Sequence, residues 1–270
     1  MTSARVGLLV VAGVAAVTGV VTVQSTAHTS ARLTPTPTES AVAAELSDLP
    51  APASLGLHVG RPRPLPNLAT PSRWSNVLRQ VTARRAPGRR EPVIAVVGTR
   101  TPEGTANILL VQGSRTVAGS LWLRVRLPIL PNNATGWVPR SALGAYHVVE
   151  THLVVDRERL SATLYDSGRP VFRAPIGVGQ ARWPTPTGSF YVRDRVTGYR
   201  SPFYGPIAFG TSARSTVLTD WPGGGFIGIH GTDQAGLLPG RVSHGCIRMR
   251  NADIRRLAAL MPVGTPLTIQ

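Results

Sequence analysis

The amino-acid sequence predicts a mainly β protein with one short helix near its C-terminal end. Short runs rich in valine, isoleucine, leucine and aromatic residues recur along the chain, and glycine, proline or asparagine separates them, as expected for strands and turns. The 28 glycines and 24 prolines among 270 residues favour many turns and few long helices. Strands do not alternate with long helices, which disfavours a doubly wound parallel sheet.

The N-terminal segment has the composition of an export signal. Arg5 precedes an uncharged apolar stretch, Val6 to Val23, that is just long enough to cross a bilayer. The small residues Ser25-Thr26-Ala27 follow it and offer a cleavage site. We therefore expect residues 1–27 to be a signal peptide or a membrane anchor, and the rest of the chain to be extracytoplasmic: secreted to the cell wall or anchored to the membrane by this segment.

Residues 28–90 are rich in proline and arginine and predict an extended linker. Within them Trp74, Val77, Leu78 and Val81 follow Ser72 at the i, i+3, i+4, i+7 spacing of an amphipathic helix. The sequence therefore predicts one short helix inside the linker.

Residues 91–145 change to short strand-like runs and predict a small β module. Trp122 and Leu123 open one such run, and Gly136-Trp137-Val138-Pro139 forms another. These two runs resemble bacterial SH3-like modules, and the resemblance implies a small β-barrel that spaces the next domain or docks a ligand.

Residues 146–270 predict a second β domain that ends in a helix and a strand. Between Asn251 and Met261 the apolar residues Ile254, Leu257 and Ala258 recur at helical spacing, and Pro262 ends the segment. Asn251 or Asp253 stands near the helix start, where a capping residue is expected.

The charge balance favours an anionic partner. The chain has a formal net charge of +16 with 29 arginines and no lysine. The arginines are spread over linker, small module and C-terminal domain, so they lack the focus of a nucleic-acid groove. We expect an anionic membrane or wall surface as the partner, and no nucleic acid.

The single cysteine, Cys246, excludes a disulfide framework and a multi-cysteine metal cluster. It lies in Ser243-His244-Gly245-Cys246-Ile247-Arg248, and Ile229-His230-Gly231-Thr232 stands upstream. A thiolate nucleophile needs a proton acceptor and a positive field, which the histidines and Arg248 supply. A buried packing cysteine and a zinc site of His230, His244 and Cys246 are the alternatives; the fourth ligand of a zinc site is missing.

The IHGT and SHGCIRM motifs resemble the signature of the L,D-transpeptidase (YkuD-type) catalytic domain. Thr185-Pro-Thr-Gly-Ser-Phe190, Tyr204-Gly-Pro-Ile207 and Gly264-Thr-Pro-Leu-Thr-Ile269 also resemble segments of that family, in the same order. The resemblance covers residues 147–270. It implies a β-sandwich or barrel of the L,D-transpeptidase type, with the short helix after the active-site cysteine and the small SH3-like barrel before it.

The resemblance also implies a role for each residue of the motifs. Cys246 is the expected nucleophile, attacking the carbonyl of the third residue of a peptidoglycan stem peptide and expelling the terminal D-alanine. His230 is the expected base, oriented by the Gly231 carbonyl. His244 and the N–H groups of Gly245 and Cys246 are expected at the oxyanion site.

Arg248 and Ser243 are the expected substrate-binding residues, with Arg248 steadying the loop or facing a substrate carboxylate. The thioacyl enzyme reacts with the amine of a second stem peptide, so donor and acceptor stems are the expected partners. The resemblance further implies acylation of Cys246 by a carbapenem, and it implies neither cofactor nor metal. Two alternatives are an L,D-carboxypeptidase, which uses water as the acceptor, and a wall-binding protein without activity.

Overall fold

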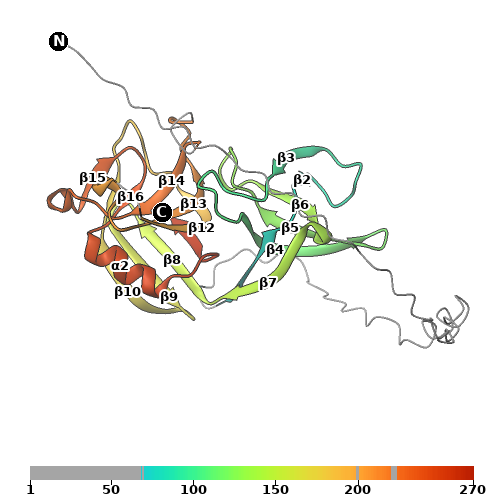
Figure 1. Cartoon of the computed structure of the whole chain (residues 1–270), viewed down its shortest axis with the longest axis horizontal. Helices are drawn as coiled ribbons and strands as arrows, with labels where there is room; N and C mark the ends of the chain where they lie inside the picture. The colour runs from blue at the N-terminus through green and yellow to red at the C-terminus, as the bar shows by residue number, and fades with distance from the viewer. Residues whose placement is uncertain (1–67, 69, 199–200, 220–223) are drawn as a thin grey trace, which may run out of the picture. The chain divides into compact units, whose positions relative to one another are not determined.

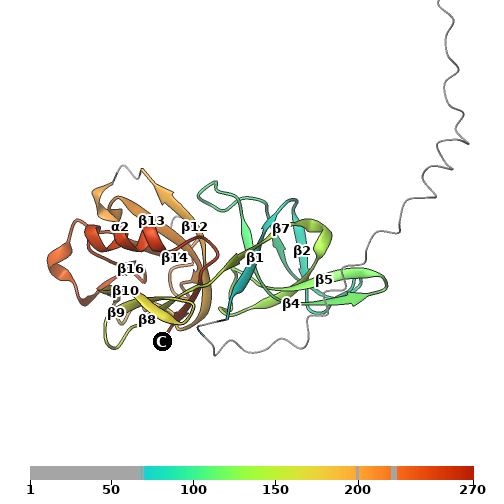
Figure 2. The same ribbon diagram turned by 90° about the horizontal axis from the view of Figure 1, so that it is seen from below.

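The computed structural model describes residues 68, 70–198, 201–219 and 224–270, and its described strands form two β-sheets (Figures 1 and 2). The predicted signal or anchor, residues 1–27, and most of the predicted linker lie outside the described residues. In the described part of the chain no helix is long and apolar enough to span a membrane.

The smaller sheet has seven described strands in the order β3-β2-β6-β5-β4-β1-β7, and every neighbouring pair is antiparallel. Alternate residues of these strands point into a core that contains Val81, Leu109, Leu123, Val125 and Val138. The strands are β1 (Ser72–Val77), β2 (Val81–Arg84), β3 (Val93–Val97), β4 (Ile108–Val117), β5 (Ser120–Arg126), β6 (Thr135–Pro139) and β7 (Leu143–Val149).

Residues 72–84 belong to this sheet, so the predicted helix in the linker is wrong and the linker ends earlier than residue 90. β1 pairs with both β4 and β7, which makes it an interior strand. Leu78 is 64% exposed, so the apolar residues of this segment do not share one helical face. Over so few residues the helical spacing also fits strands, and pairing with distant strands decides between the two.

The larger sheet has ten described strands in the order β10-β9-β8-β17-β12-β13-β14-β16-β11-β15. Three of its pairs are parallel, namely β8 with β17, β14 with β16, and β11 with β15. The strands are β8 (Thr151–Asp156), β9 (Ser161–Asp166), β10 (Arg169–Pro175), β11 (Gly177–Gly179), β12 (Gly188–Thr197), β13 (Ile207–Arg214), β14 (Phe226–His230), β15 (Gly240–Ser243), β16 (Ile247–Arg248) and β17 (Pro266–Ile269).

Helix α2 (Asn251–Leu260) follows β16 directly and packs on the core of the larger sheet. Its buried residues are Ile254, Leu257 and Ala258, all of which belong to the apolar pattern in the sequence. Short 3-10 turns complete the described elements: Arg140–Ala142, Pro202–Tyr204 and Ala235–Leu237. The prediction of a mainly β fold with one short helix after the cysteine is confirmed for the described residues.

Leu257 and Leu260 of α2 provide a matched test of this packing, because Leu257 is 0% exposed and Leu260 is 44% exposed. We expect Leu257→Ala to lower the free energy of unfolding by about 2–5 kcal/mol, since it leaves a cavity in the core. Leu260→Ala should change it by less than about 0.5 kcal/mol. Urea unfolding of both variants measures the difference, and equal effects would contradict the packing described here.

Candidate active site

The two halves of the cysteine–histidine motif meet through the parallel pairing of β14 with β16. Ile229 lies opposite Ile247, and His230 lies opposite Arg248. Because side chains alternate along a strand, the buried isoleucines face the core while His230 and Arg248 face the other side of the sheet. Cys246 stands just before this ladder, and the N–H of Gly228 donates a hydrogen bond to its Sγ at 3.3 Å.

His230 is held in one orientation by its own loop. Its Nδ1 lies 2.6 Å from the carbonyl oxygen of Gly231, so Nδ1 carries the proton and Nε2 keeps its lone pair. The residue is only 2% exposed. The pKa of His230 is lowered to about 4, chiefly by burial and to a smaller extent by the nearby positive charge of Arg248, and the Gly231 bond acts in the opposite direction. The imidazole is therefore neutral at physiological pH.

The thiol of Cys246 is neutral in the same range. Burial raises its pKa, while the Gly228 hydrogen bond and the positive charge of Arg248 act in the opposite direction. The site therefore holds an uncharged thiol and an uncharged imidazole in one cleft, and Nε2 is the ring atom that could accept a proton. This arrangement suits a nucleophile that is activated by an adjacent base.

Ser243 and Gly245 shape the turn that presents the thiol. The Ser243 hydroxyl donates to the Cys246 carbonyl at 2.6 Å and accepts the Gly245 N–H at 3.1 Å. Gly245 has φ of +118°, a conformation that favours glycine. These bonds engage the Gly245 N–H and the Ser243 hydroxyl within the turn, and the oxyanion role of Gly245 and the substrate contact of Ser243 stay predictions.

Thr185 ties this turn to the preceding part of the sheet, a role that sequence reasoning missed. Its buried hydroxyl donates to the Gly245 carbonyl at 2.7 Å and accepts the N–H of Gly179 at 2.9 Å. The Thr-Pro-Thr-Gly segment carried a family resemblance, but nothing in the sequence indicated which hydroxyl would reach the cysteine turn.

Arg248 places a buried positive charge beside the thiol. The residue is 4% exposed, and its Nη1 lies 3.3 Å from the side-chain oxygen of Gln234. Its guanidinium carbon lies 4.3 Å from the centre of the Phe203 ring, and its buried Nε has no hydrogen-bond partner. A buried guanidinium with spare donor capacity is suited to an anionic ligand.

Cys246 and His230 line one cleft of about 440 Å³, a volume that includes solvent at its mouth. Aromatic residues contribute much of its wall. The Tyr204 ring meets the His230 ring edge to face at 5.0 Å between centroids. The other described lining residues are Phe203, Ser215, Leu218, Gly225, Phe226, Ile227, Ser243, His244 and Arg248.

His244 lies at the exposed side of the cleft and contacts the Trp183 ring, with ring centroids 4.0 Å apart and the ring planes tilted by 43°. Arg182 in turn lies over Trp183 at 3.6 Å from the ring centre. These contacts of a cation and an imidazole with one aromatic ring restrict the orientation of His244. The sequence placed His244 in the site, but it gave no signal for Arg182 and Trp183.

Asn251 holds the loop that orients His230. The sequence pattern suggested it as a helix cap, but the N-terminus of α2 has no side-chain cap bond. Instead the side-chain oxygen of Asn251 accepts the N–H of Thr232 at 3.0 Å. A Cβ on Gly231 would come within 2.3 Å of that oxygen, so this close contact requires glycine at position 231.

No group of three or more His, Cys, Asp or Glu side chains within the described ranges is placed to hold a metal ion. His230 uses Nδ1 for the Gly231 carbonyl, and the His244 ring contacts the Trp183 ring. The chemistry that this arrangement can perform is nucleophilic: a thiol, a neutral base and a buried cation in one cleft.

Fold and site together define a cysteine–histidine domain on a mixed β-sheet, and comparison with known proteins gives its family. A model of the L,D-transpeptidase catalytic domain, YkuD, matches residues 150–269. A YkuD protein of Bacillus subtilis is 33% identical over 123 residues, covering 46% of this chain and 68% of the relative. A YkuD protein of Bacillus licheniformis is 35% identical over 106 residues, covering 39% of this chain and 57% of the relative.

The chain also resembles solved L,D-transpeptidase structures. The catalytic domain of the Enterococcus faecium enzyme, "E. faecium L,D-transpeptidase", is 26% identical and covers 44% of this chain and 96% of that domain, with a TM-score of 0.34. Mycobacterium tuberculosis L,D-transpeptidase 3, solved with a faropenem-derived adduct, is 17% identical and covers 56% of this chain and 91% of the other, with a TM-score of 0.37.

The chain belongs to the YkuD family of L,D-transpeptidase catalytic domains. The matched residues contain the motif pair of His230 and Cys246 and begin just after β7, the last strand of the smaller sheet. The likeness of the smaller sheet to SH3-like modules stays a prediction.

The buried neutral His230 makes stability depend on pH. Its pKa is about 4 in the folded protein against 6.5 ordinarily, so the unfolded chain binds a proton first as the pH falls. Stability is therefore lost between about pH 6.5 and pH 4, and the shift corresponds to roughly 3 kcal/mol. Urea unfolding across this range should show a smaller loss in His230→Asn than in the wild type. His152, whose pKa burial also lowers, is unchanged in both proteins, so equal slopes would contradict the prediction.

Proposed function

We propose that the protein is an exported L,D-transpeptidase that cross-links or remodels peptidoglycan stem peptides through a thioacyl enzyme on Cys246. The observation that carries the proposal is the placement of a neutral His230 and a neutral Cys246 in one cleft of a YkuD domain. Membership of the family supports peptide acyl transfer, and the site supplies the nucleophile and the base for it.

Acylation starts from the neutral pair. As the Cys246 sulfur attacks the carbonyl carbon of the third stem residue, Nε2 of His230 takes the thiol proton. The positive charge of Arg248 and the Gly228 N–H stabilise the sulfur as it becomes anionic. The tetrahedral intermediate then collapses, the bond to D-alanine breaks, and the imidazolium returns the proton to the departing amine.

The thioester is resolved by a second nucleophile. An amine from an acceptor stem attacks the acyl carbon, Nε2 accepts its proton, and the proton returns to the sulfur as the thiolate leaves. The products are a cross-linked pair of stems and free enzyme. Water in place of the amine gives a trimmed stem instead, which is the carboxypeptidase reaction.

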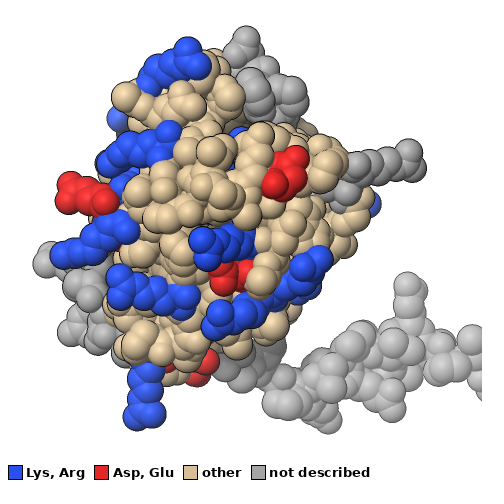
Figure 3. Space-filling view, turned by 90° about the vertical axis from the view of Figure 1, so that its left-hand side faces the viewer, with Lys and Arg blue, Asp and Glu red and all other residues tan. Residues whose placement is uncertain are grey.

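Residues 6–23 support export, since an uncharged apolar stretch behind an arginine is typical of a signal or anchor. The face that carries β15, α2 and β10 supports an anionic surface as partner, because arginines are common on it and acidic side chains are fewer (Figure 3). The exposed arginines of these elements include Arg173, Arg241, Arg255 and Arg256. Such a field attracts a polyanionic wall or an anionic membrane.

The reaction is tested by incubating the full chain with a disaccharide-tetrapeptide and reading the products by mass. We expect Cys246→Ala to abolish turnover, because no other group in the cleft forms the thioester. A cross-linked dimer identifies the transpeptidase, and a trimmed tripeptide identifies the carboxypeptidase. A carbapenem should add once to the wild type and not to Cys246→Ala. Retained turnover in Cys246→Ala, or a wild type without any adduct, would overturn the proposed mechanism.

Arg248 is proposed to bind a carboxylate of the donor stem, because its charge is buried in the cleft and its Nε has no partner. Arg248→Met keeps the apolar stem and removes the charge. We expect the KM for the tetrapeptide donor to rise roughly 10- to 100-fold, the range of a charge-assisted hydrogen bond. Arg250→Met, which removes an exposed arginine two positions away, is the control. A similar KM for both variants would contradict the assignment.

A further inference from the structure

Two loops of the smaller sheet reach strands of the larger sheet. The first, the 98–107 loop, joins β3 to β4 and is stiffened by internal bonds, including those between Thr101 and Thr105. The second, the 129–134 loop, joins β5 to β6. The 98–107 loop contacts β12, and the 129–134 loop contacts both β12 and β13. Of these two strands, β13 is the one that pairs with β14.

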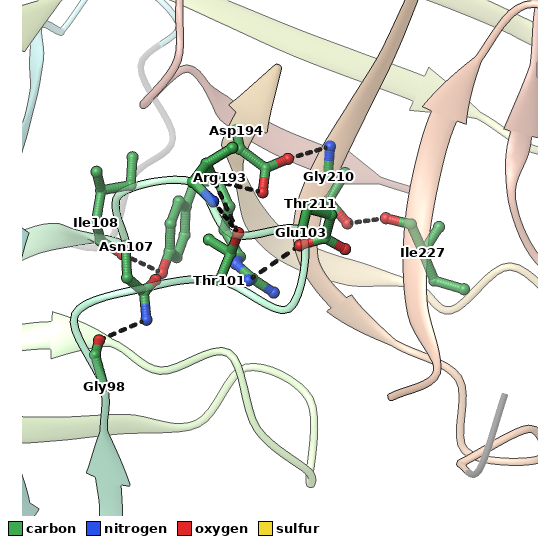
Figure 4. A network of polar contacts seen from close by, with 12 residues as sticks. Gly98, Thr101, Glu103, Asn107, Ile108, Arg193, Asp194, Gly210, Thr211 and Ile227 are labelled. Atoms are coloured by element: carbon green, nitrogen blue, oxygen red, sulfur yellow. Dashed lines mark hydrogen bonds and ion pairs between the residues drawn. The ribbon is translucent and has the colours of Figure 1, made fainter. Parts of the chain in front are cut away.

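The 98–107 loop supplies the acidic partner of a buried arginine. Arg193 of β12 is 2% exposed, and its Nη2 lies 3.9 Å from a carboxylate oxygen of Glu103. Figure 4 shows the two side chains pointing toward one another across the space between the loop and the strand. The guanidinium carbon of Arg193 also lies 4.0 Å from the centre of the Phe226 ring. Glu103 therefore fixes a cation that contacts Phe226.

The 129–134 loop holds a second arginine that contacts the same ring. The side-chain amide of Asn132 donates to the carbonyl of Arg214 at 2.7 Å and accepts its N–H at 2.9 Å. This pairing fixes the end of β13, where Arg214 lies directly opposite Phe226 in the strand register. The guanidinium carbon of Arg214 is 4.8 Å from the Phe226 ring centre.

A third set of contacts leads from the smaller sheet to Ile227, the residue that follows Phe226 in β14. Thr105 donates to one oxygen of the buried Asp194 at 3.1 Å, and the other oxygen accepts the N–H of Gly210 at 2.9 Å. In the next residue of β13, Thr211 donates to the carbonyl of Ile227 at 2.6 Å. Figure 4 traces this series from the loop to β14.

These contacts converge on the start of the strand that carries the chemistry. Phe226 and Ile227 line the cleft with Cys246. One residue further along β14 the Gly228 N–H bonds to the thiol, and the strand ends at His230. The position of Phe226 therefore sets both the wall of the cleft and the start of the strand that holds the catalytic groups.

We propose that the smaller sheet supports the donor site from outside the cleft, with Glu103 and Asn132 as positioning residues that hold the Phe226 wall through Arg193 and Arg214. The proposal rests on the proposed transpeptidase function for its substrate, a stem tetrapeptide. It assigns the smaller sheet a function within the reaction, beyond that of a spacer. Neither residue touches the reacting atoms, so their loss changes the fit of the donor more than the chemical step.

The test compares Glu103→Gln and Asn132→Ala with Glu91→Gln, a matched control on the smaller sheet whose backbone contacts lie within that sheet. We expect Glu103→Gln and Asn132→Ala to raise the KM for the tetrapeptide donor roughly tenfold and to change kcat less than threefold. Glu91→Gln should leave both constants unchanged. A loss of stability alone would lower the amount of folded enzyme, and hence apparent kcat, without raising KM.

A double-mutant cycle shows whether Glu103 acts through Phe226. In a Phe226→Leu background, where the ring is absent, Glu103→Gln should change KM less than twofold, because the interaction it supports has already gone. Full additivity of the two substitutions would overturn the proposed route. Should Asn132→Ala fail to fold, Glu103→Gln decides the test alone, since it conserves side-chain volume on a loop.

Amide hydrogen exchange separates this proposal from the proposed function. In the full chain, Glu103→Gln should increase exchange at Phe226, Ile227 and Gly228, and Glu91→Gln should not. This measurement needs no substrate, so it holds even where the wild type fails to process the tetrapeptide. Unchanged exchange at β14 together with an unchanged KM would overturn the positioning role.

Discussion

Two short parallel strands hold the groups on which the proposed chemistry depends. β14 and β16 pair over only two register positions, yet this pairing sets His230 beside Arg248 and brings the Gly228 N–H to Cys246. The buried isoleucines on the opposite face fix the pairing, because a shift of one residue would turn them out of the core. The core of the larger sheet thereby determines the geometry of the cleft.

Burial at this pairing also sets the electrostatics of the site. The same packing that lowers the pKa of His230 raises that of Cys246, so a neutral pair is the resting state. The charge of Arg248 favours a thiolate and disfavours an imidazolium. In the proposed reaction an ion pair therefore forms only as the thiol attacks. The low polarity around it strengthens each contact that stabilises developing charge.

The geometry of the cleft also depends on contacts that the smaller sheet, outside the YkuD domain, makes with the larger one. Arg193 and Arg214 are residues of the larger sheet, but their partners Glu103 and Asn132 belong to the smaller one. Burying an arginine without an acidic partner costs folding free energy. Glu103 therefore offsets part of the cost of burying Arg193. The two sheets are thus joined at β12 and β13, and β13 pairs with β14.

The sequence by itself determined the mainly β class and the α2 helix, because strand runs and helical spacing are local properties. It also singled out His230 and Cys246 by their reactive residue types, and their catalytic roles stay predictions. It misassigned residues 72–81 to a helix, since only pairing with β4 and β7 shows that they form a strand. Tertiary structure alone decided that Ser243 and Gly245 bond within their turn and that Thr185 and Phe226 reach the site. Hydrogen bonds and ring contacts between distant segments leave no periodic trace in a sequence, so only the folded chain shows them.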